Sequence, residues 1–118
     1  MAYIEGFLVA VPTANKARYI EAASKLVPMM KDFGVTRFVE NWGDDVPEGK
    51  VTDFRRAVNA EPGEKIAFSW IEWPSRAVRD AAWAQIMADP SLAPNEDEAG
   101  AVDNRRRIFG GFVPILDQ

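Results

Sequence analysis

The sequence predicts an α+β domain in which two helices cover one face of an antiparallel sheet. Residues 65–73, KIAFSWIEW, have the composition of a strand, and both of its faces are largely apolar because alternate side chains point to opposite sides. Such a strand belongs at the centre of a covered sheet. Two segments, 15–34 and 75–89, carry apolar residues at helical spacing. The resulting order, β-α-β-β-β-α-β, is ferredoxin-like with one strand more than the minimum, in a single domain over residues 1–118.

The first half of the chain supplies a strand, a helix and a second strand. Residues 3–11 are rich in aromatic and branched side chains and end at a proline, as strands often do. Asn15 is the expected N-cap of the first helix, and Gly34 the expected residue after its C-terminus. Pro28 lies inside this helix and should bend it, because proline lacks an N–H. Residues 35–42 form the second predicted strand.

The second half supplies a hairpin, the central strand and the second helix. Residues 43–49, GDDVPEG, have turn-forming composition, and residues 51–60 resume an extended pattern. A long hairpin is therefore expected to join the second and third strands. Pro74 ends the central strand, and Ser75 is a good N-cap for a helix that runs to Asp89.

The C-terminal part is predicted to contain a surface segment and a last strand. Residues 91–104 are polar, acidic and proline-bearing, which is typical of a surface loop or a short irregular helix. Residues 107–116 return to a strand pattern. Gly110 and Gly111 lie in its middle, where glycine indicates a bulge or a close approach of another group to the backbone.

The face of the sheet that the helices leave uncovered is predicted to be apolar. The aromatic residues expected there are Phe7, Phe38, Trp42, Phe68 or Trp70, and Phe112. An exposed patch of this kind is typical of an interface. A homodimer in which two sheets pack face to face is the simplest assembly, because two-fold pairing needs only one self-complementary surface.

The composition excludes several classes of chemistry. The chain has no cysteine and no histidine, so thiol nucleophiles, Ser-His-Asp or Cys-His catalysis and typical zinc sites are excluded. A net charge of −4 disfavours nucleic-acid binding, which needs a basic surface. The apolar N-terminal run is too short to span a bilayer and lacks a signal-peptide pattern, so a cytoplasmic protein without membrane association is expected.

Four stretches together resemble a known family. They are YIEGFLVAVP, FGVTRFVENWGDDVPEGKVTDFRRAV, FSWIEWPSRAVRDAAW and RRRIFGGFVPI, and they cover nearly the whole chain. In order and spacing they are similar to the YbaA-like family of bacterial proteins. The resemblance implies the dimeric α+β barrel fold, in which two ferredoxin-like protomers pack their sheets together. It implies no reaction, and a name that links some relatives to signal recognition particle RNA has no support in this acidic sequence.

The first candidate site is the pair of acids Glu40 and Glu72. Each lies two residues from a tryptophan along its strand and so shares a face with it. These tryptophans are Trp42 and Trp70. A carboxylate desolvated on an apolar face has a raised pKa and can act as a general acid or base near neutral pH. The alternative is that each acid pairs with an arginine such as Arg37 or Arg107 and serves only the fold or the dimer.

The second candidate site is the loop that carries Asp44, Asp45 and Asp53. Three carboxylates within ten residues could bind a hard cation through oxygen. The spacing matches no calcium loop, and aspartate in a turn more often caps the backbone, so no metal centre is predicted. The loop is expected to line the mouth of the barrel.

Two further groups could bind a small molecule. Trp42 and Trp70 belong to an aromatic set that could line a cavity, although core or interface packing explains the same residues. The other members are Phe38, Phe68, Trp73 and Phe112. Arg37 or Arg107 could orient an anionic ligand, while the plainer account of the run 105–107 is a solvated strand end.

Two functional hypotheses remain. The first is an enzyme or binding protein for a small molecule that needs no cofactor, with Glu40 and Glu72 as acid and base. The second is a non-catalytic homodimeric module whose aromatic residues serve only the interface. They differ in whether a cavity with an unpaired carboxylate remains in the folded protein.

Overall fold

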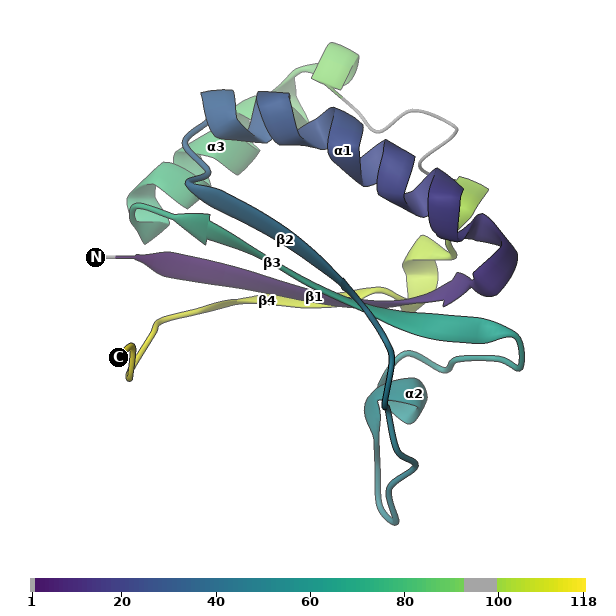
Figure 1. Cartoon of the computed structure of the whole chain (residues 1–118). Helices are drawn as coiled ribbons and strands as arrows, with labels where there is room; N and C mark the ends of the chain where they lie inside the picture. The colour runs from purple at the N-terminus through teal and green to yellow at the C-terminus, as the bar shows by residue number, and fades with distance from the viewer. Residues whose placement is uncertain (1, 93–99) are drawn as a thin grey trace.

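The computed structural model describes residues 2–92 and 100–118. Its strands are β1 (Tyr3–Pro12), β2 (Arg37–Trp42), β3 (Glu64–Trp73) and β4 (Ile108–Phe112). Its α-helices are α1 (Lys16–Asp32), α2 (Phe54–Ala57) and α3 (Arg76–Ala88), and 3-10 turns span Thr13–Asn15, Pro90–Leu92 and Asn104–Arg106. Helices α1 and α3 lie on one side of the sheet, and α2 with its flanking loop lies on the other (Figure 1).

The four strands form one antiparallel sheet in the order β2-β3-β1-β4. Strands β1 and β3 are central and pair along their full length, from Tyr3 opposite Trp73 to Pro12 opposite Glu64. This order, with α1 and α3 on the same face, is the ferredoxin-like arrangement of two interleaved β-α-β units. The predicted fold class is confirmed, and so is the central position of the strand at residues 65–73.

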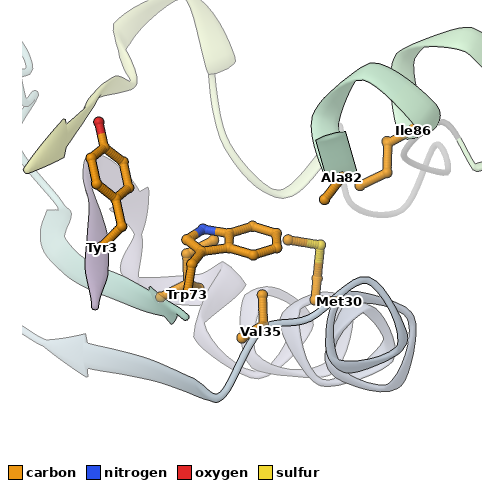
Figure 2. Packing of buried hydrophobic residues seen from close by; sticks show 7 residues of the cluster. Tyr3, Met30, Val35, Trp73, Ala82 and Ile86 are labelled. Atoms are coloured by element: carbon orange, nitrogen blue, oxygen red, sulfur yellow. The ribbon is translucent and has the colours of Figure 1, made fainter. Parts of the chain in front are cut away.

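The helix-covered face of the sheet carries the main core. Every second residue of β3 is buried beneath the helices: Ala67, Ser69, Ile71 and Trp73. Trp73, only 1% exposed, belongs to the same cluster as Tyr3, Met30 and Val35 (Figure 2). Ala82 and Ile86 close this cluster from α3. The apolar residues of α3, which recur every 3.6 residues, thus pack against those of β3, which recur every second residue, in one apolar layer.

The opposite face of the sheet, called here the open face, is largely uncovered. Its aromatic and aliphatic residues include Phe68, Ile108 and Phe112, which are 42%, 44% and 59% exposed. At one end, the loop that contains α2 places Val58 against Ala10 and Ile66. The rest of the open face therefore exposes apolar side chains that have no covering layer among the described residues.

Three aromatic residues expected on the open face lie instead under the helices. Phe7 pairs with Ser69, Phe38 with Ile71 and Trp42 with Ala67, and directly paired residues share a face. The prediction was wrong for these three because the face of a strand depends on its pairing register, which strand alternation alone does not give. It was right for Phe68, Trp70 and Phe112.

The predicted strand at residues 51–60 is also wrong. This segment contains the short helix α2, whose N-cap is Asp53. The Asp53 carboxylate accepts hydrogen bonds from the backbone N–H of Arg56 at 2.7 Å and of Gly49 at 3.0 Å. These bonds close the segment locally, so it does not extend the sheet, and the additional strand of the predicted order is not formed.

The local stop and start signals are mostly confirmed. Ser75 caps α3 by accepting a hydrogen bond from the N–H of Val78 at 3.2 Å. Gly34, after α1, has a φ of 116°, a conformation that favours glycine. Asn15 is the N-cap of α1 by position, but its amide donates to the carbonyl oxygen of Ala101 at 3.1 Å rather than capping the helix. Helix α1 continues through Pro28.

The last strand is shorter than predicted, at Ile108–Phe112, and explains one of its two glycines. A Cβ atom added at Gly111 would overlap the ring and hydroxyl of Tyr3. The predicted close approach to the backbone is thus confirmed at this position. Half of the polar segment predicted at 91–104, residues 93–99, lies outside the described residues.

Candidate functional site

A cavity of about 180 Å³ lies between the helix-covered face of the sheet and helices α1 and α3. Its walls are mainly apolar and come from Phe7, Leu26, Met29, Met30, Phe38, Ile71, Trp83, Ile86 and Leu92. Four polar residues also line it: Tyr19, Glu40, Ser69 and Arg107. A concave apolar site with a few polar groups is the usual form of a small-molecule site.

Tyr19 and Glu40 form a hydrogen-bonded pair in this cavity. The Tyr19 hydroxyl, on α1, donates to Oε2 of Glu40, on β2, at 2.7 Å. Burial raises the pKa of Glu40 above its usual value of 4.5, and the hydrogen bond from Tyr19 and the charge of Arg107 oppose that rise. Burial, followed by the charge of Glu40, raises the pKa of Tyr19 as well, so its hydroxyl keeps its proton. Glu40 is therefore the group in this cavity suited to exchange a proton.

Arg107 brings a positive charge to the cavity. It precedes β4, and its Nε atom is buried without a hydrogen-bond acceptor among the described residues. The two arginines before it are neutralised elsewhere: Arg106 binds both carboxylate oxygens of Glu64 at 2.8 Å, and Arg105 binds Asp103 at 3.0 Å. The run predicted as a solvated strand end is thus divided among three environments.

A second buried acid, Glu5 on β1, fixes one wall of the cavity. Glu5 is 3% exposed, and its Oε1 accepts hydrogen bonds from the indole N–H groups of Trp73 at 2.9 Å and Trp83 at 2.7 Å. Its Oε2 lies 3.5 Å from Nη1 of Arg79 on α3. Because Trp83 lines the cavity, its hydrogen bond to Glu5 positions this part of the cavity wall.

The two acids predicted as a pair lie on opposite faces of the sheet. Glu40 is opposite Ser69 on the helix-covered face, whereas Glu72 is opposite Arg37 on the open face. Glu72 Oε2 accepts from the Trp70 indole at 3.2 Å and lies 3.7 Å from Arg37 Nη1. The expectation of one shared apolar face is therefore wrong, and Glu72 has the ion pair that the alternative account foresaw.

The other predicted residues also lie away from the cavity. Arg37 and Trp70 are on the open face, with the guanidinium 5.9 Å from the ring centre. Trp42 is on the helix-covered face but outside the cavity lining, with the ammonium of Lys16 5.2 Å from its ring centre. From the predicted residues the structure brings Glu40 and Arg107 together at the cavity, with Phe38 of the aromatic set in its wall, and places the others outside the lining.

The aspartates of the 43–53 loop also lie outside the cavity lining. Asp53 caps α2, as the structural alternative held, and these backbone hydrogen bonds lower its pKa. Asp44 and Asp45 are exposed. Within residues 2–92 and 100–118, no three acidic side chains come together in a way that could hold a metal ion.

Sequence reasoning missed Tyr19 and Glu5. Glu5 alternates with Tyr3 and Phe7 along β1, so a charged side chain within an inward-facing apolar row was a readable signal of a buried, partnered acid. Tyr19 lies three residues before Ala22 on the inward face of α1, so helical spacing alone indicates that its side chain faces the sheet. Its partner Glu40 depends on the β2–β3 register, and no local pattern reports that register.

The fold and the cavity together define a ferredoxin-like α+β protein with a pocket between its sheet and helices. The family model described as "Protein of unknown function (DUF1428)" matches residues 2–103, and the chain belongs to this family. It is 51% identical to "Uncharacterized protein YbaA" of Escherichia coli (strain K12) over 118 residues, which is the full length of both chains. The resemblance noted from the sequence motifs is confirmed.

Solved structures support the fold. A dimeric ferredoxin-like protein from an uncultured marine organism is 15% identical, with a TM-score of 0.62 over 100% of both chains. A dimeric ferredoxin-like protein of unknown function from Jannaschia sp. CCS1 is 13% identical, with a TM-score of 0.58 over 95% of this chain and 99% of that one. At these identities the likeness shows the fold alone. Among the residues described, no helix has both the length and the apolar character needed to cross a membrane.

Proposed function

We propose that this protein binds a small, mostly apolar molecule in the cavity between its sheet and helices. The observation that carries the proposal is the cavity itself, about 180 Å³ in volume, whose apolar walls are interrupted by polar side chains. An apolar cavity of about 150 Å³ accommodates one benzene molecule, so the expected ligand has one ring or an aliphatic chain of similar size. It would be smaller than a typical drug-sized ligand.

Glu40 is the candidate acid or base for a reaction in this cavity. Its raised pKa and its position beside the ligand volume suit proton transfer, and the Tyr19 hydroxyl holds it in place. Glu72 has no part in this proposal because it lies on the other face of the sheet. The enzyme hypothesis therefore depends on one carboxylate rather than on a pair, with no cofactor required.

The same proposal includes a homodimer formed through the open face. This face exposes Phe68, Ile108 and Phe112, and two structurally similar proteins are described as dimeric. Packing two such faces together would remove this apolar surface from water. A cytoplasmic location, expected from the sequence, also belongs to the proposal. If the cavity bound nothing, the dimer would remain as the alternative function, a non-catalytic interaction module.

A cavity-filling substitution tests the binding proposal. Ala23 lines the cavity from α1, and Ala23→Phe would place a ring in it. Ala17→Phe is the matched control, because Ala17 is exposed on the same helix and does not line the cavity. Phenol is a suitable uncharged probe, and saturation-transfer NMR reports its binding.

Phenol is expected to bind the wild type and Ala17→Phe and to lose its signal with Ala23→Phe. Circular dichroism checks that each variant folds, and Ala23→Leu replaces Ala23→Phe if the latter does not. Absence of binding to the wild type, or an equal signal with the filled variant, would contradict the proposal.

A further inference from the structure

The polar groups of the cavity differ in whether they already have hydrogen-bond partners. The Tyr19 hydroxyl already donates to Glu40 at 2.7 Å. The Nε–H of Arg107 is buried and has no acceptor among the described residues. A buried donor without an acceptor is costly, so Arg107 is the polar residue of the cavity whose guanidinium still has hydrogen-bonding capacity.

The charge at this position favours an anion. A guanidinium is always protonated in proteins, so Arg107 carries a full positive charge. Its neighbours Arg105 and Arg106 have their own carboxylate partners in Asp103 and Glu64. In the described part of the chain no carboxylate lies in ion-pair contact with Arg107, and its charge acts on the carboxyl of Glu40 only from a greater distance, where it lowers the pKa of that acid.

The rest of the cavity limits what the anion can be. The walls opposite these polar groups come from aromatic and aliphatic side chains, including Phe38, Ile71 and Trp83. Only a few polar side chains line the cavity, so most of the charged groups of a multiply charged ligand would be buried without partners. One charged head group and one apolar body satisfy both parts of the site.

We propose that the cavity is specific for a small monocarboxylate, whose carboxylate is held by the guanidinium of Arg107 while its ring or chain lies among the apolar walls. This inference rests on the proposed function and adds the chemical class of the ligand. A carboxylate is preferred because its oxygens match the planar guanidinium, and charge-assisted hydrogen bonds of this kind are stronger than neutral ones. Benzoate has the size that a cavity of about 180 Å³ accepts.

A comparison of benzoate with benzamide isolates the charge from the shape. The wild type is expected to bind benzoate about 10-fold more tightly than benzamide, as measured by NMR titration. Arg107→Gln is expected to remove this preference by weakening benzoate about 10-fold while leaving benzamide within about 2-fold. Arg105→Gln removes the same charge from the exposed neighbouring residue and should keep the preference.

Each outcome decides between specific accounts. If neither probe binds the wild type, both the proposed function and this inference fail. If both bind equally, the binding function stands and the carboxylate inference is overturned. It is also overturned if Arg107→Gln keeps the preference, or if Arg105→Gln loses it as strongly. Should Arg107→Gln not fold, Arg107→Lys keeps the charge, and loss of the preference in that variant supports the guanidinium contact.

Discussion

Replacing Glu5 is expected to cost more stability than replacing any exposed acid of the chain. Glu5→Leu would leave the indole N–H groups of Trp73 and Trp83 buried without their acceptor, at about 1–3 kcal/mol each. Arg79 would lose a charge partner 3.5 Å away but would keep Asp80, whose Oδ1 lies 2.8 Å from its Nε. The sum is about 2–6 kcal/mol, centred near the 3–5 kcal/mol measured when one partner of a buried ion pair is removed.

Urea unfolding followed by circular dichroism measures this loss. With a slope of about 1.5–2 kcal/mol per molar, a loss of about 4 kcal/mol lowers the midpoint by roughly 2–3 M. Glu5→Gln is the matched control, because its amide oxygen can still accept both indole hydrogen bonds while the charge is removed. We expect it to cost about 1–2 kcal/mol. A cost below about 1 kcal/mol for Glu5→Leu, or equal costs for the two variants, would refute the two-indole account of this residue.

Three other predictions concern the open face, the cavity acid and the turn after α1. Phe68→Ala should weaken a homodimer about 30-fold in sedimentation experiments. The reason is that Phe68 is 42% exposed, and burying this part of the ring is worth about 1 kcal/mol in each of two protomers. Met87→Ala, at a residue 84% exposed on α3, should leave the dimer dissociation constant unchanged. Glu40→Gln should abolish a pH dependence of wild-type stability. Folding raises the pKa of Glu40, so the contribution of this group to stability is fully present below pH 4.5, the usual pKa of the side chain. The contribution is lost as the pH rises through the raised pKa. Urea midpoints across this pH range that change equally in both proteins would contradict this. Gly34→Ala should lower the urea midpoint, because φ is 116° there and the added Cβ would lie 2.6 Å from Val78 Cγ1; an unchanged midpoint would show that the turn adapts.

The parts of the fold that the sequence predicted are those that neighbouring residues determine. The alternation of β3 and the cap at Ser75 depend on a few adjacent positions, and both agree with the structure. Residues 51–60 were ambiguous because a short segment of mixed apolar and polar residues fits a strand and one helical turn equally well. There Asp53 decided the outcome, since its carboxylate satisfies two backbone N–H groups.

The candidate site depended on information that no single segment holds. Glu40 faces the cavity only because β2 pairs with β3 in a register that places it opposite Ser69, and a slip of one residue would turn it to the open face. Arg107 comes to the cavity from a segment more than sixty residues away in the chain. A prediction based on strand alternation could therefore propose Glu40 and Glu72 as candidates, but it could not tell which of the two acids faces the cavity.

Strand β3 takes part in both proposed activities, since Ser69 lines the cavity and Trp70, the next residue, lies on the open face. Ligand binding and dimerisation would thus be two equilibria that share one strand. If benzoate changes the dimer dissociation constant by some factor, dimerisation must change the affinity for benzoate by the same factor, because the two paths around the thermodynamic cycle have equal free energy. Measuring the dimer constant with and without benzoate therefore also measures how the assembly tunes the pocket.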